Sequence, residues 1–392
     1  MCADHSSDAT RRLLTALVAC RSVTPSDAGA LDLVGARLAA AGFRCERIDR
    51  GGVSNLWARY GTRAPLVCLA GHVDVVPPGP IEQWRSDPFV ASERDGYLYG
   101  RGVADMKGSV AAMVTAAERL VQRAAPAGSI AMLLTSDEEG DAVHGTAAVV
   151  EHLVARGDTI DACILGEPTS SDRLGDTIKN GRRGSLNGAL RVHGVQCHIA
   201  YPERGRNPIV DALPALAELA AIEWDTGDEH FPPTRFQFSN VQAGTGATNV
   251  IPGTMDVRFN IRFSPASPVD RLTARIQGVL DRHRLQYELV WAPAALPFVT
   301  PRGRLVDAVS EAVTAVTGLV PALSTSGGTS DGRFLAPVSR EVIEVGPVNE
   351  SIHKIDERLR LDDLGPLSAI YERAVSSLLV QRPLEQAGRP PD

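Results

Sequence analysis

The alternation of short apolar segments with longer helical patterns constrains the fold most. Short stretches dominated by apolar residues recur at 64–76, 129–138 and 161–168. Apolar residues at helical spacing mark the stretches at 9–23, 29–43 and 105–124. Buried strands have the first kind of pattern, and amphipathic helices have the second. Their alternation predicts an α/β domain with a largely parallel sheet.

The pattern changes near residue 184, where a segment with a different order of elements begins. Strand and helix patterns follow one another at 184–195, 207–224, 234–244, 255–264, 267–284 and 285–293. The order strand, helix, strand, strand, helix, strand predicts a ferredoxin-like α+β sandwich. Asn207 followed by Pro208 is a favourable start for the first helix of this segment.

Long helical and strand patterns return after residue 297, so the second domain is inserted into the first. Helical spacing marks 303–318 and 364–380, and a short apolar strand lies at 340–347. A chain of 392 residues also exceeds one ordinary hydrophobic core. We therefore predict a larger domain at 1–183 and 295–382, an inserted domain at 184–294, and a disordered tail at 383–392.

Charge and composition exclude several classes of protein. The net charge of −7 disfavours nucleic acid and anionic membranes as partners. No apolar run approaches the ~18 residues that cross a bilayer, and the first residues lack the apolar core of a signal peptide. The six cysteines are scattered, and none forms a C-x-x-C pair. We interpret them as reduced thiols of a cytoplasmic protein, not as a disulfide or zinc–thiolate framework.

Histidines and carboxylates follow the predicted strands. Open α/β sheets bind ligands beyond the carboxyl ends of their strands. The residues at these positions are His72, Asp74, Asp105, Glu138, Glu139, Glu167 and His353. Adjacent acids such as Glu138 and Glu139 repel one another at the end of a buried strand, so a cationic centre would stabilise them. Two histidines with several carboxylates and no thiol suit zinc, cobalt or manganese.

Each of these residues alone has an ordinary structural explanation. Asp105 could cap the helix that follows it, and Glu138 and Glu139 could form a solvated turn. A histidine after a strand is more often structural than a metal ligand. The joint position of acids and histidines after five strands of one sheet favours the metal site.

Five stretches of the sequence resemble the co-catalytic zinc peptidases and deacylases of the M20 family. They read "GHVDVVPPG", "GRGVADMKGS", "TSDEEGDAVHGT", "GEPTSSDRLGDTIKNGRRGS" and "GPVNESIHK". The resemblance extends over nearly the whole chain, and "KNGRRGS", "GTSDGRF" and "NPI" make it most similar to the succinyl-diaminopimelate desuccinylase branch. It implies an α/β zinc-hydrolase domain with an inserted ferredoxin-like dimerisation (lid) domain. It also implies an amidohydrolase of lysine and diaminopimelate biosynthesis whose substrate is a small anionic N-acyl amino acid.

The resemblance implies two zinc ions per subunit, with cobalt as an alternative in one site. His72 and Glu167 would hold one ion, and Glu139 and His353 would hold the other. Asp105 would bridge both ions. Two metal ions held in this way activate a bridging water for the hydrolysis of an amide.

The resemblance also assigns roles next to the ligands. Asp74 would hydrogen-bond the free ring nitrogen of His72 and fix its tautomer. Glu138 would be the general base rather than a ligand. The peptide bond between Asp105 and Met106 would be cis, as is common in the family.

A homodimer formed through the inserted domain is a further implication of the resemblance. The inserted domain would deliver His198 to the active site of the other subunit, where it would stabilise the oxyanion. As a core histidine, His198 would have no catalytic role, and this alternative stays open. Cys197 departs from the family, which usually has Gly there, and its larger side chain could shift the loop.

Substrate contacts are implied in the same way. An anionic substrate requires cations and hydrogen-bond donors. The matching positions are Lys179, Arg182, Ser185, Tyr201, Arg262, Gly328, Thr329 and Asn349, with Asn249 reaching across from the other subunit. Thr248 stands where close relatives often have a second Asn, so this chain lacks that amide. An exposed, ion-paired side chain is the alternative interpretation of each arginine.

Two other functions stay open at this point. A related deacylase, such as an acetylornithine deacetylase or the deacylase of another N-acyl amino acid, would share the metal motifs. The arginines of "KNGRRGS" favour the desuccinylase branch over these enzymes. A metal-free binding protein on the same fold would not need all five ligands and Glu138, which this chain retains.

Overall fold

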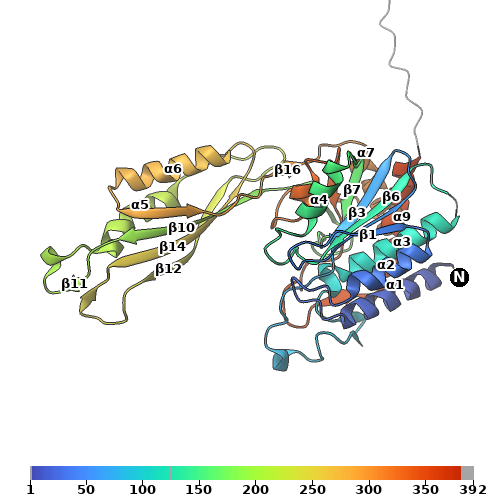
Figure 1. Cartoon of the computed structure of the whole chain (residues 1–392), viewed down its shortest axis with the longest axis horizontal. Helices are drawn as coiled ribbons and strands as arrows, with labels where there is room; N and C mark the ends of the chain where they lie inside the picture. Colours follow the sequence, from blue (N-terminus) through green and yellow to red (C-terminus); the bar gives the residue numbers. More distant parts are fainter. Residues whose placement is uncertain (1, 124, 381–392) are drawn as a thin grey trace, which may run out of the picture. The chain divides into compact units, whose positions relative to one another are not determined.

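The computed structural model describes residues 2–123 and 125–380, and it forms two compact units (Figure 1). The larger unit comprises Met1–Gly181, Thr300–Ser324 and Ser330–Asp392, and the smaller unit comprises Arg182–Val299 and Thr325–Thr329. The predicted domain boundaries at 184 and 294 lie inside the smaller unit. That unit also includes Thr325–Thr329, which the sequence prediction places in the larger domain. The predicted tail at 383–392 lies outside the described residues.

An eight-stranded mixed sheet forms the centre of the larger unit. In spatial order its strands are β1 (Arg44–Arg47), β2 (Asn55–Tyr60), β6 (Ser129–Thr135), β3 (Leu66–His72), β7 (Ala162–Leu165), β18 (Val342–Glu344), β8 (Thr177–Lys179) and β17 (Ala322–Ser324). The central run β6-β3-β7-β18 is parallel, whereas β1 and β2 are antiparallel to their neighbours. The prediction of an α/β domain with a mainly parallel sheet is confirmed.

Helices cover both faces of this sheet. They are α1 (Cys2–Ala19), α2 (Ala30–Ala40), α3 (Gly108–Arg123), α4 (Thr146–Ala155), α7 (Arg304–Thr317), α8 (Gly332–Leu335) and α9 (Leu361–Leu379). Leu14 of α1, Val114 of α3 and Ile370 of α9 share one buried cluster with Leu69 of β3. Helix α4 packs against β2 and β6, and its buried Val149 lies outside that cluster. This double cover explains why every residue of β3 and β6 is buried.

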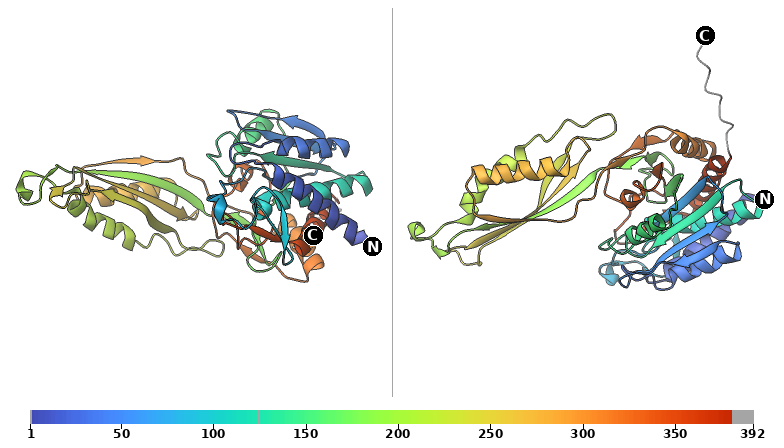
Figure 2. Two further views of the ribbon diagram at one scale, coloured as in Figure 1. Left: turned by 90° about the horizontal axis from the view of Figure 1, so that it is seen from below. Right: turned by 45° about the horizontal axis from the view of Figure 1, so that its top comes forward.

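The smaller unit is a four-stranded antiparallel sheet with two helices. In spatial order the strands are β12 (Arg235–Ala243), β14 (Thr254–Phe263), β10 (Gly184–His193) and β15 (Tyr287–Trp291), and the helices are α5 (Pro208–Ala221) and α6 (Val269–Arg282). Both helices lie along this sheet (Figure 2). Leu216 of α5 and Ile276 of α6 share a buried cluster with Phe259 of β14. The predicted ferredoxin-like order is confirmed, and Asn207 caps α5 by accepting the Ile209 N–H at 3.0 Å.

Short elements complete the two units. The strands β4 (Ser92–Arg94), β5 (Tyr97–Tyr99) and β19 (Arg358–Arg360) form a small sheet, β11 (Cys197–His198) pairs with β13 (Val250–Ile251), and β9 (Gly181–Arg182) pairs with β16 (Phe298–Val299). Helical turns lie at Ile81–Gln83, Val103–Lys107 and Pro202–Arg204. The small sheets fix loops rather than build cores, because their strands have only two or three residues each.

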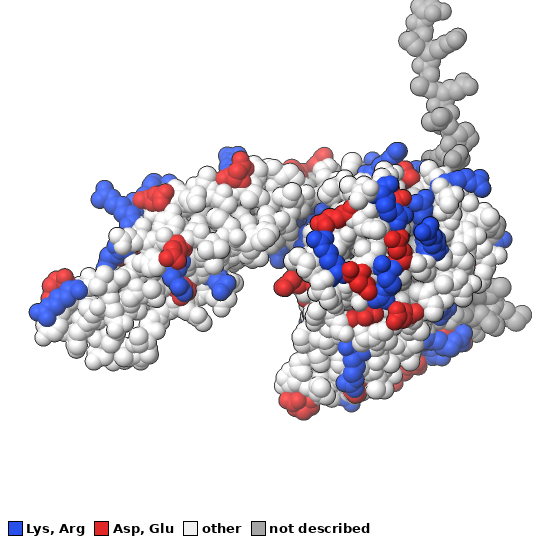
Figure 3. All heavy atoms as spheres, viewed as in Figure 1, with Lys and Arg blue, Asp and Glu red and all other residues white. Residues whose placement is uncertain are grey.

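The surface carries charges of both signs. Figure 3 shows acidic and basic side chains interspersed over the visible face of the larger unit, without a continuous basic stripe. The visible face of the smaller unit includes a broad area without Lys, Arg, Asp or Glu. Within the part of the chain that the structure describes, no helix combines the length and the apolar character needed to cross a membrane.

Candidate metal centre and active site

Three neighbouring parallel strands bring polar residues to one edge of the large sheet. Strand β3 ends at His72, whose register partner is Thr135, the last residue of β6. Glu138 and Glu139 follow Thr135, and Glu167 follows β7. Because β6, β3 and β7 are parallel, their carboxyl ends meet at the same edge, where α/β sheets form their sites.

A kinked segment before α3 places Asp105 at this edge. Asp105 leaves the helical conformation (φ −122°, ψ 96°), and the Asp105–Met106 peptide bond is cis. The predicted cis bond is therefore confirmed. The fully buried Met106 packs against Gly71, where an added Cβ would lie 2.1 Å from its Cε. Gly71 thus lets the kinked segment approach β3 directly beside His72.

The buried carboxylate of Glu357 holds the same segment in place. Its carboxylate accepts the backbone N–H groups of Gly102 at 2.8 Å, Ala104 at 2.9 Å and Asp105 at 3.1 Å. It also accepts Arg101 Nη1 at 2.9 Å, and Arg101 and Glu357 are both buried. A carboxylate that receives four donors in the interior fixes the backbone on which Asp105 depends.

We expect Glu357→Ala to destabilise the protein by about 3–5 kcal/mol, because it leaves the buried Arg101 charge and three N–H groups without their partner. The substitution should also lower the metal affinity, because the backbone of Asp105 would no longer be held by Glu357. Chemical denaturation and metal titration measure the two effects. Glu350→Ala is the matched control, because Glu350 lies nearby in the chain and pairs with Arg358 at the surface. Equal behaviour of the two variants would contradict the anchoring role.

The two predicted ligand histidines lie on opposite sides of the Asp105 carboxylate. His72 Nε2 is 3.3 Å from Asp105 Oδ1, and His353 Nε2 is 3.3 Å from Asp105 Oδ2. Glu167 Oε1 lies 3.9 Å from His72 Nε2. Glu139 Oε1 lies 2.9 Å from His353 Nε2. Each oxygen of Asp105 therefore faces one histidine, and each histidine has one glutamate beside it.

The charges at this edge favour positive groups between the carboxylates. Hydrogen bonds to Asp105 and Glu139 raise the pKa of His353 to about 10. Burial lowers the pKa of His72, but the contact with the Asp105 carboxylate and the charges of the other nearby acids outweigh this effect and raise the pKa well above the usual range. Without a metal, the carboxylates thus stabilise the protonated imidazoles. Metal ions would replace those protons, because a ligand histidine must be neutral.

The donor set fits two metal ions that share Asp105. His72, Asp105 and Glu167 have ligand atoms within 4.8 Å of one another, and so have Asp105, Glu139 and His353. His72 Nε2 and Asp105 Oδ1 are buried and have no hydrogen-bond partner among the described residues. Orphaned buried donors and acceptors of this kind are rare unless an unseen ion or water satisfies them. Nitrogen and oxygen ligands without thiolate suit zinc and related divalent ions.

A comparison with known families agrees with this geometry. Residues 68–377 match the peptidase family M20/M25/M40. The chain belongs to the M20 peptidase family. The desuccinylase of Dechloromonas aromatica (strain RCB), named "Succinyl-diaminopimelate desuccinylase", is 58% identical over 375 residues, which cover 95% of this chain and 99% of that protein. A protein of Aromatoleum aromaticum with the same name is 59% identical, covering 96% of this chain and 98% of that protein.

Solved structures share the fold of this M20 protein. The M20 family metallo-carboxypeptidase Sso-CP2 from Sulfolobus solfataricus superposes with a TM-score of 0.81 at 16% identity. The superposition covers 94% of this chain and 99% of that one. At this low identity the likeness concerns the fold alone.

Glu138 lies beside the ligands of the M20 protein. Its carboxylate, His72 and Glu139 form a third group of donor atoms within 4.8 Å. Burial, followed by the nearby charge of Glu167, raises the pKa of Glu138 well above the usual range of a carboxyl group. This position beside the candidate ligands is compatible with the predicted general-base role of Glu138, which remains a prediction.

Asp74 makes contacts that differ from the predicted ones. The prediction places its carboxylate on the free ring nitrogen of His72. In the structure, His72 Nδ1 lies 2.9 Å from the backbone oxygen of Asp74 and 3.6 Å from its Oδ1. The carboxylate instead accepts the backbone N–H groups of Glu138 at 3.4 Å and Glu139 at 3.1 Å. Asp74 thus orients His72 through its main chain, because its side chain holds the acidic loop.

Two predicted substrate contacts, Lys179 and Asn349, lie in the larger unit. Lys179 is the last residue of β8 and donates to Ser324 Oγ at 3.2 Å. Its register partner is Glu344, the last residue of β18. The backbone N–H of Asn349 donates to the Ser170 oxygen at 2.9 Å. Their roles toward a substrate remain predictions.

Five further predicted contacts lie at one end of the sheet in the smaller unit. They are Arg182, Ser185, Arg262, Gly328 and Thr329. Ser185 and Arg262 are register partners on β10 and β14. Arg182 Nη1 donates to the Gly328 oxygen at 3.4 Å. Gly327 has φ +102°, a conformation that residues with a Cβ rarely adopt, so glycine suits this position beside Arg182.

His198, Tyr201 and Asn249 lie together elsewhere in the smaller unit. His198 pairs with Val250 across β11 and β13, and the Ile199 N–H donates to the Asn249 oxygen at 3.0 Å. The rings of His198 and Tyr201 have centroids 5.7 Å apart. Cys197, the departure from the family pattern, donates its thiol to the Tyr201 oxygen at 3.6 Å. Its side chain therefore contributes to the turn that carries His198.

The structure also reveals site neighbours that sequence patterns did not indicate. Asp331 is buried and accepts Thr146 Oγ1 at 2.6 Å, and burial raises its pKa to about 6. Its charge is among those that raise the pKa of Glu138. Lys107 is buried, donates to the Cys20 oxygen at 2.9 Å, and has its pKa lowered by burial to about 8. Their only sequence signal was the motifs "GTSDGRF" and "GRGVADMKGS".

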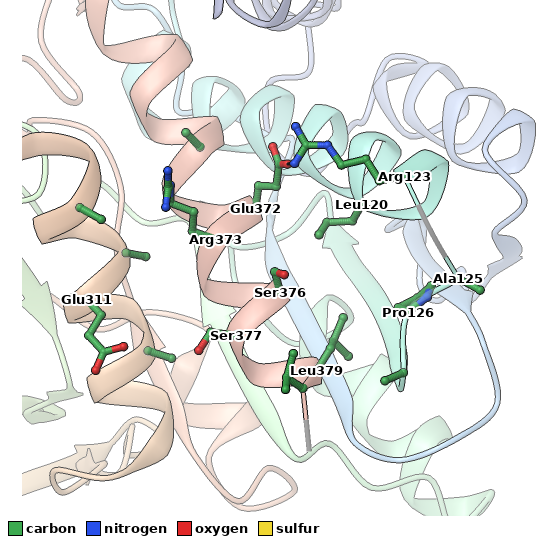
Figure 4. A pocket seen from close by; sticks show the side chains of 16 residues that line it. Leu120, Arg123, Ala125, Pro126, Glu311, Glu372, Arg373, Ser376, Ser377 and Leu379 are labelled. Carbon is green, nitrogen blue, oxygen red and sulfur yellow. Dashed lines mark ion pairs between the residues drawn. The ribbon is translucent and has the colours of Figure 1, made fainter. Parts of the chain in front are cut away.

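A separate hollow of about 950 Å³ lies between α3, α7 and α9 (Figure 4). Its described lining includes none of the predicted site residues and no histidine. The charges in it are partly compensated, because Glu372 pairs with both Arg119 and Arg123. The described lining of this hollow therefore lacks the ligands and the general base that the predicted hydrolysis requires.

Proposed function

We propose that this M20 protein is a two-zinc amidohydrolase that cleaves N-succinyl-LL-2,6-diaminopimelate into succinate and LL-2,6-diaminopimelate. The observation that carries the reaction type is the Asp105 carboxylate between two His–Glu pairs. The relatives named succinyl-diaminopimelate desuccinylase, at 58% and 59% identity over nearly the full length, support the substrate. The reaction belongs to lysine and diaminopimelate biosynthesis.

The metal ions would activate a water and polarise the carbonyl of the substrate amide. His72 and Glu167 would hold one ion, Glu139 and His353 the other, and Asp105 would hold both. Cobalt in place of zinc in one site fits the same nitrogen and oxygen donors.

Glu138 would move the proton. It takes a proton from the attacking water as a new C–O bond forms at the succinyl carbonyl. It then gives that proton to the nitrogen as the C–N bond breaks, which releases the amine. Its carboxylate lies within 4.8 Å of the donor atoms of His72 and Glu139, close enough to reach a water held at those ligands.

A homodimer through the smaller unit is part of the proposal. Strand β12 is an edge strand, and unpaired edges attract further strands. Val241 on this strand and Val210 and Leu213 on the adjacent α5 are 54%, 59% and 56% exposed. A second copy would bury these apolar side chains and pair the open edge. In that dimer, His198 and Asn249 would serve the active site of the other subunit.

A cytoplasmic location and a small anionic substrate, rather than nucleic acid or a membrane, complete the proposal. The cysteines Cys20, Cys45, Cys68, Cys163 and Cys197 are free thiols, as reducing conditions require. On the face visible in Figure 3, acidic and basic side chains are mixed and form no basic track of the kind that binds a nucleic acid.

The test of the proposed function is an activity panel with purified zinc-loaded protein. We expect kcat/KM for N-succinyl-diaminopimelate to exceed that for N-acetylornithine and for dipeptides by at least tenfold. A preference for N-acetylornithine would indicate the related deacylase. No hydrolysis of any amide by the metal-loaded protein would contradict the enzyme assignment altogether.

Stepwise metal removal should lower activity and thermal stability together. Metal ions that bind only the folded state stabilise it by mass action, so a chelator removes that contribution. Because the two sites share Asp105 but have separate His–Glu pairs, we expect partial activity with one ion bound. Metal content, activity and Tm are measured during chelation and during zinc add-back. Full activity in the metal-free protein would contradict the mechanism.

A further inference from the structure

Three arginines converge at one end of the sheet in the smaller unit: Arg183, Arg235 and Arg262. Arg235 on β12 and Arg262 on β14 are register partners in an antiparallel pair, so their side chains leave the same face. Arg183 comes just before β10, the strand on the other side of β14. All three residues belong to the smaller unit. Of the three, only Arg262 is among the predicted substrate contacts.

Among the residues whose side chains the structure describes, no carboxylate neutralises Arg183 or Arg235. In the ranges 7–123 and 125–380, where side chains are described, neither arginine has a carboxylate within 4.0 Å. Arg183 Nε is buried without a hydrogen-bond partner there, and Nη2 reaches only the Gly327 oxygen at 3.4 Å. Burial and the nearby charge of Arg235 lower the pKa of Arg183.

Another arginine on the same sheet shows the ordinary arrangement. Arg191 on β10 donates Nε and Nη2 to the carboxylate of its register partner Asp256, at 2.7 and 3.3 Å. Opposite charges directly across a sheet stabilise it, and like charges destabilise it. Arg235 and Arg262 therefore occupy facing positions at a cost in stability that an anionic ligand would offset.

We propose that Arg235, together with Arg183 and beside Arg262, binds a carboxylate of the substrate and contributes to substrate specificity. The identity of this carboxylate rests on the proposed function, whereas the presence of an anion site does not. Guanidinium groups bind carboxylates through two parallel hydrogen bonds, which fixes orientation as well as charge. Arg235 is exposed and Arg183 half-buried, so a ligand reaches them from solvent.

The proposal predicts a separation of kinetic constants. Arg235→Gln should raise KM for N-succinyl-diaminopimelate about tenfold, the effect of losing one hydrogen bond to a charged group. The kcat should stay within about twofold, because Arg235 is not assigned to the reacting atoms. Arg258→Gln is the matched control: Arg258 is exposed, lies on the same face of β14 as Arg262, and loses the same charge.

Ligand binding and stability provide readouts that do not depend on activity. Without ligand, Arg235→Gln should melt at or above the wild-type temperature, because it removes a like-charge contact. Succinate or diaminopimelate should raise the Tm of the zinc-loaded wild type and of Arg258→Gln, and should raise that of Arg235→Gln less. Arg235→Lys, which keeps the charge without the planar fork, should restore the Tm response only in part.

The outcomes distinguish this inference from the proposed function. If the wild type hydrolyses N-succinyl-diaminopimelate and Arg235→Gln has the same KM and Tm response as Arg258→Gln, the inference is overturned. The proposed function then stays intact. If the protein hydrolyses no N-succinyl-diaminopimelate but succinate or diaminopimelate still raises its Tm through Arg235, the proposed function is rejected. The anion site is then retained. A response to inorganic phosphate alone would overturn the assignment of the site to a substrate carboxylate.

Discussion

Glu138→Gln should abolish turnover while both metal ions stay bound. The amide of Gln cannot take the proton of the attacking water, and loss of a general base typically lowers kcat by ~10²–10⁴-fold. The effect is expected at the upper end, because Glu138 lies within 4.8 Å of the donor atoms of His72 and Glu139 and would also position the water. Steady-state kinetics and metal analysis of the same preparation measure the two quantities.

The neighbouring substitution Glu139→Gln is the matched control. Glu139 Oε1 lies 2.9 Å from His353 Nε2, so this variant should lose the metal ion held with His353. Loss of a metal ion from Glu138→Gln and its retention in Glu139→Gln would show that the two roles are exchanged. Activity of Glu138→Gln within a few-fold of the wild type would exclude it as the base.

His198→Ala should lower kcat by ~10²–10³-fold, the effect of removing one oxyanion donor, and leave metal content unchanged. His198 Nδ1 accepts the Ala200 N–H at 3.1 Å, so the neutral ring carries its proton on Nε2. The ring is exposed and therefore able to donate that proton to a ligand. His193→Ala, which removes a half-buried histidine of the smaller unit that pairs with Glu288, is the control and should keep its activity.

Mixed dimers of the two dead variants test whether His198 acts on the other subunit. In a heterodimer of Glu138→Gln and His198→Ala, one active site would lack both groups, and the other would have both. Subunit exchange should therefore restore up to about half of the wild-type activity per heterodimer. If exchange is demonstrated and no activity returns, His198 does not act across the dimer.

The sequence could predict that the candidate metal ligands lie together, because most of them follow strands whose apolar patterns are strong. His72 ends β3, and Glu138, Glu139 and Glu167 follow β6 and β7, so a parallel sheet brings them together. His353 was predicted in the same way, as a residue after the strand pattern at 340–347, although a loop separates it from β18 in the structure. The family motif supported the same position.

Contacts between segments far apart in the chain could not be predicted. Glu357 lies more than 250 residues from the N–H groups of Ala104 and Asp105 that it binds. The contacts of Asp74 could not be predicted either, although its partners are closer in the chain. Its carboxylate accepts the Glu139 N–H of the acidic loop, and its backbone oxygen contacts His72 Nδ1. A carboxylate in a sequence does not reveal which of several donors it will accept.

The sequence by itself determined the two-unit organisation, the ferredoxin-like order of the smaller unit and the family, because apolar periodicity and local motifs encode these features. The tertiary structure alone decided which oxygen of Asp105 faces which histidine, and that Arg235 stands opposite Arg262. The physical reason is that strand register and loop anchoring arise from many weak contacts across the whole fold, including Glu357 with Arg101 and Met106 with Gly71.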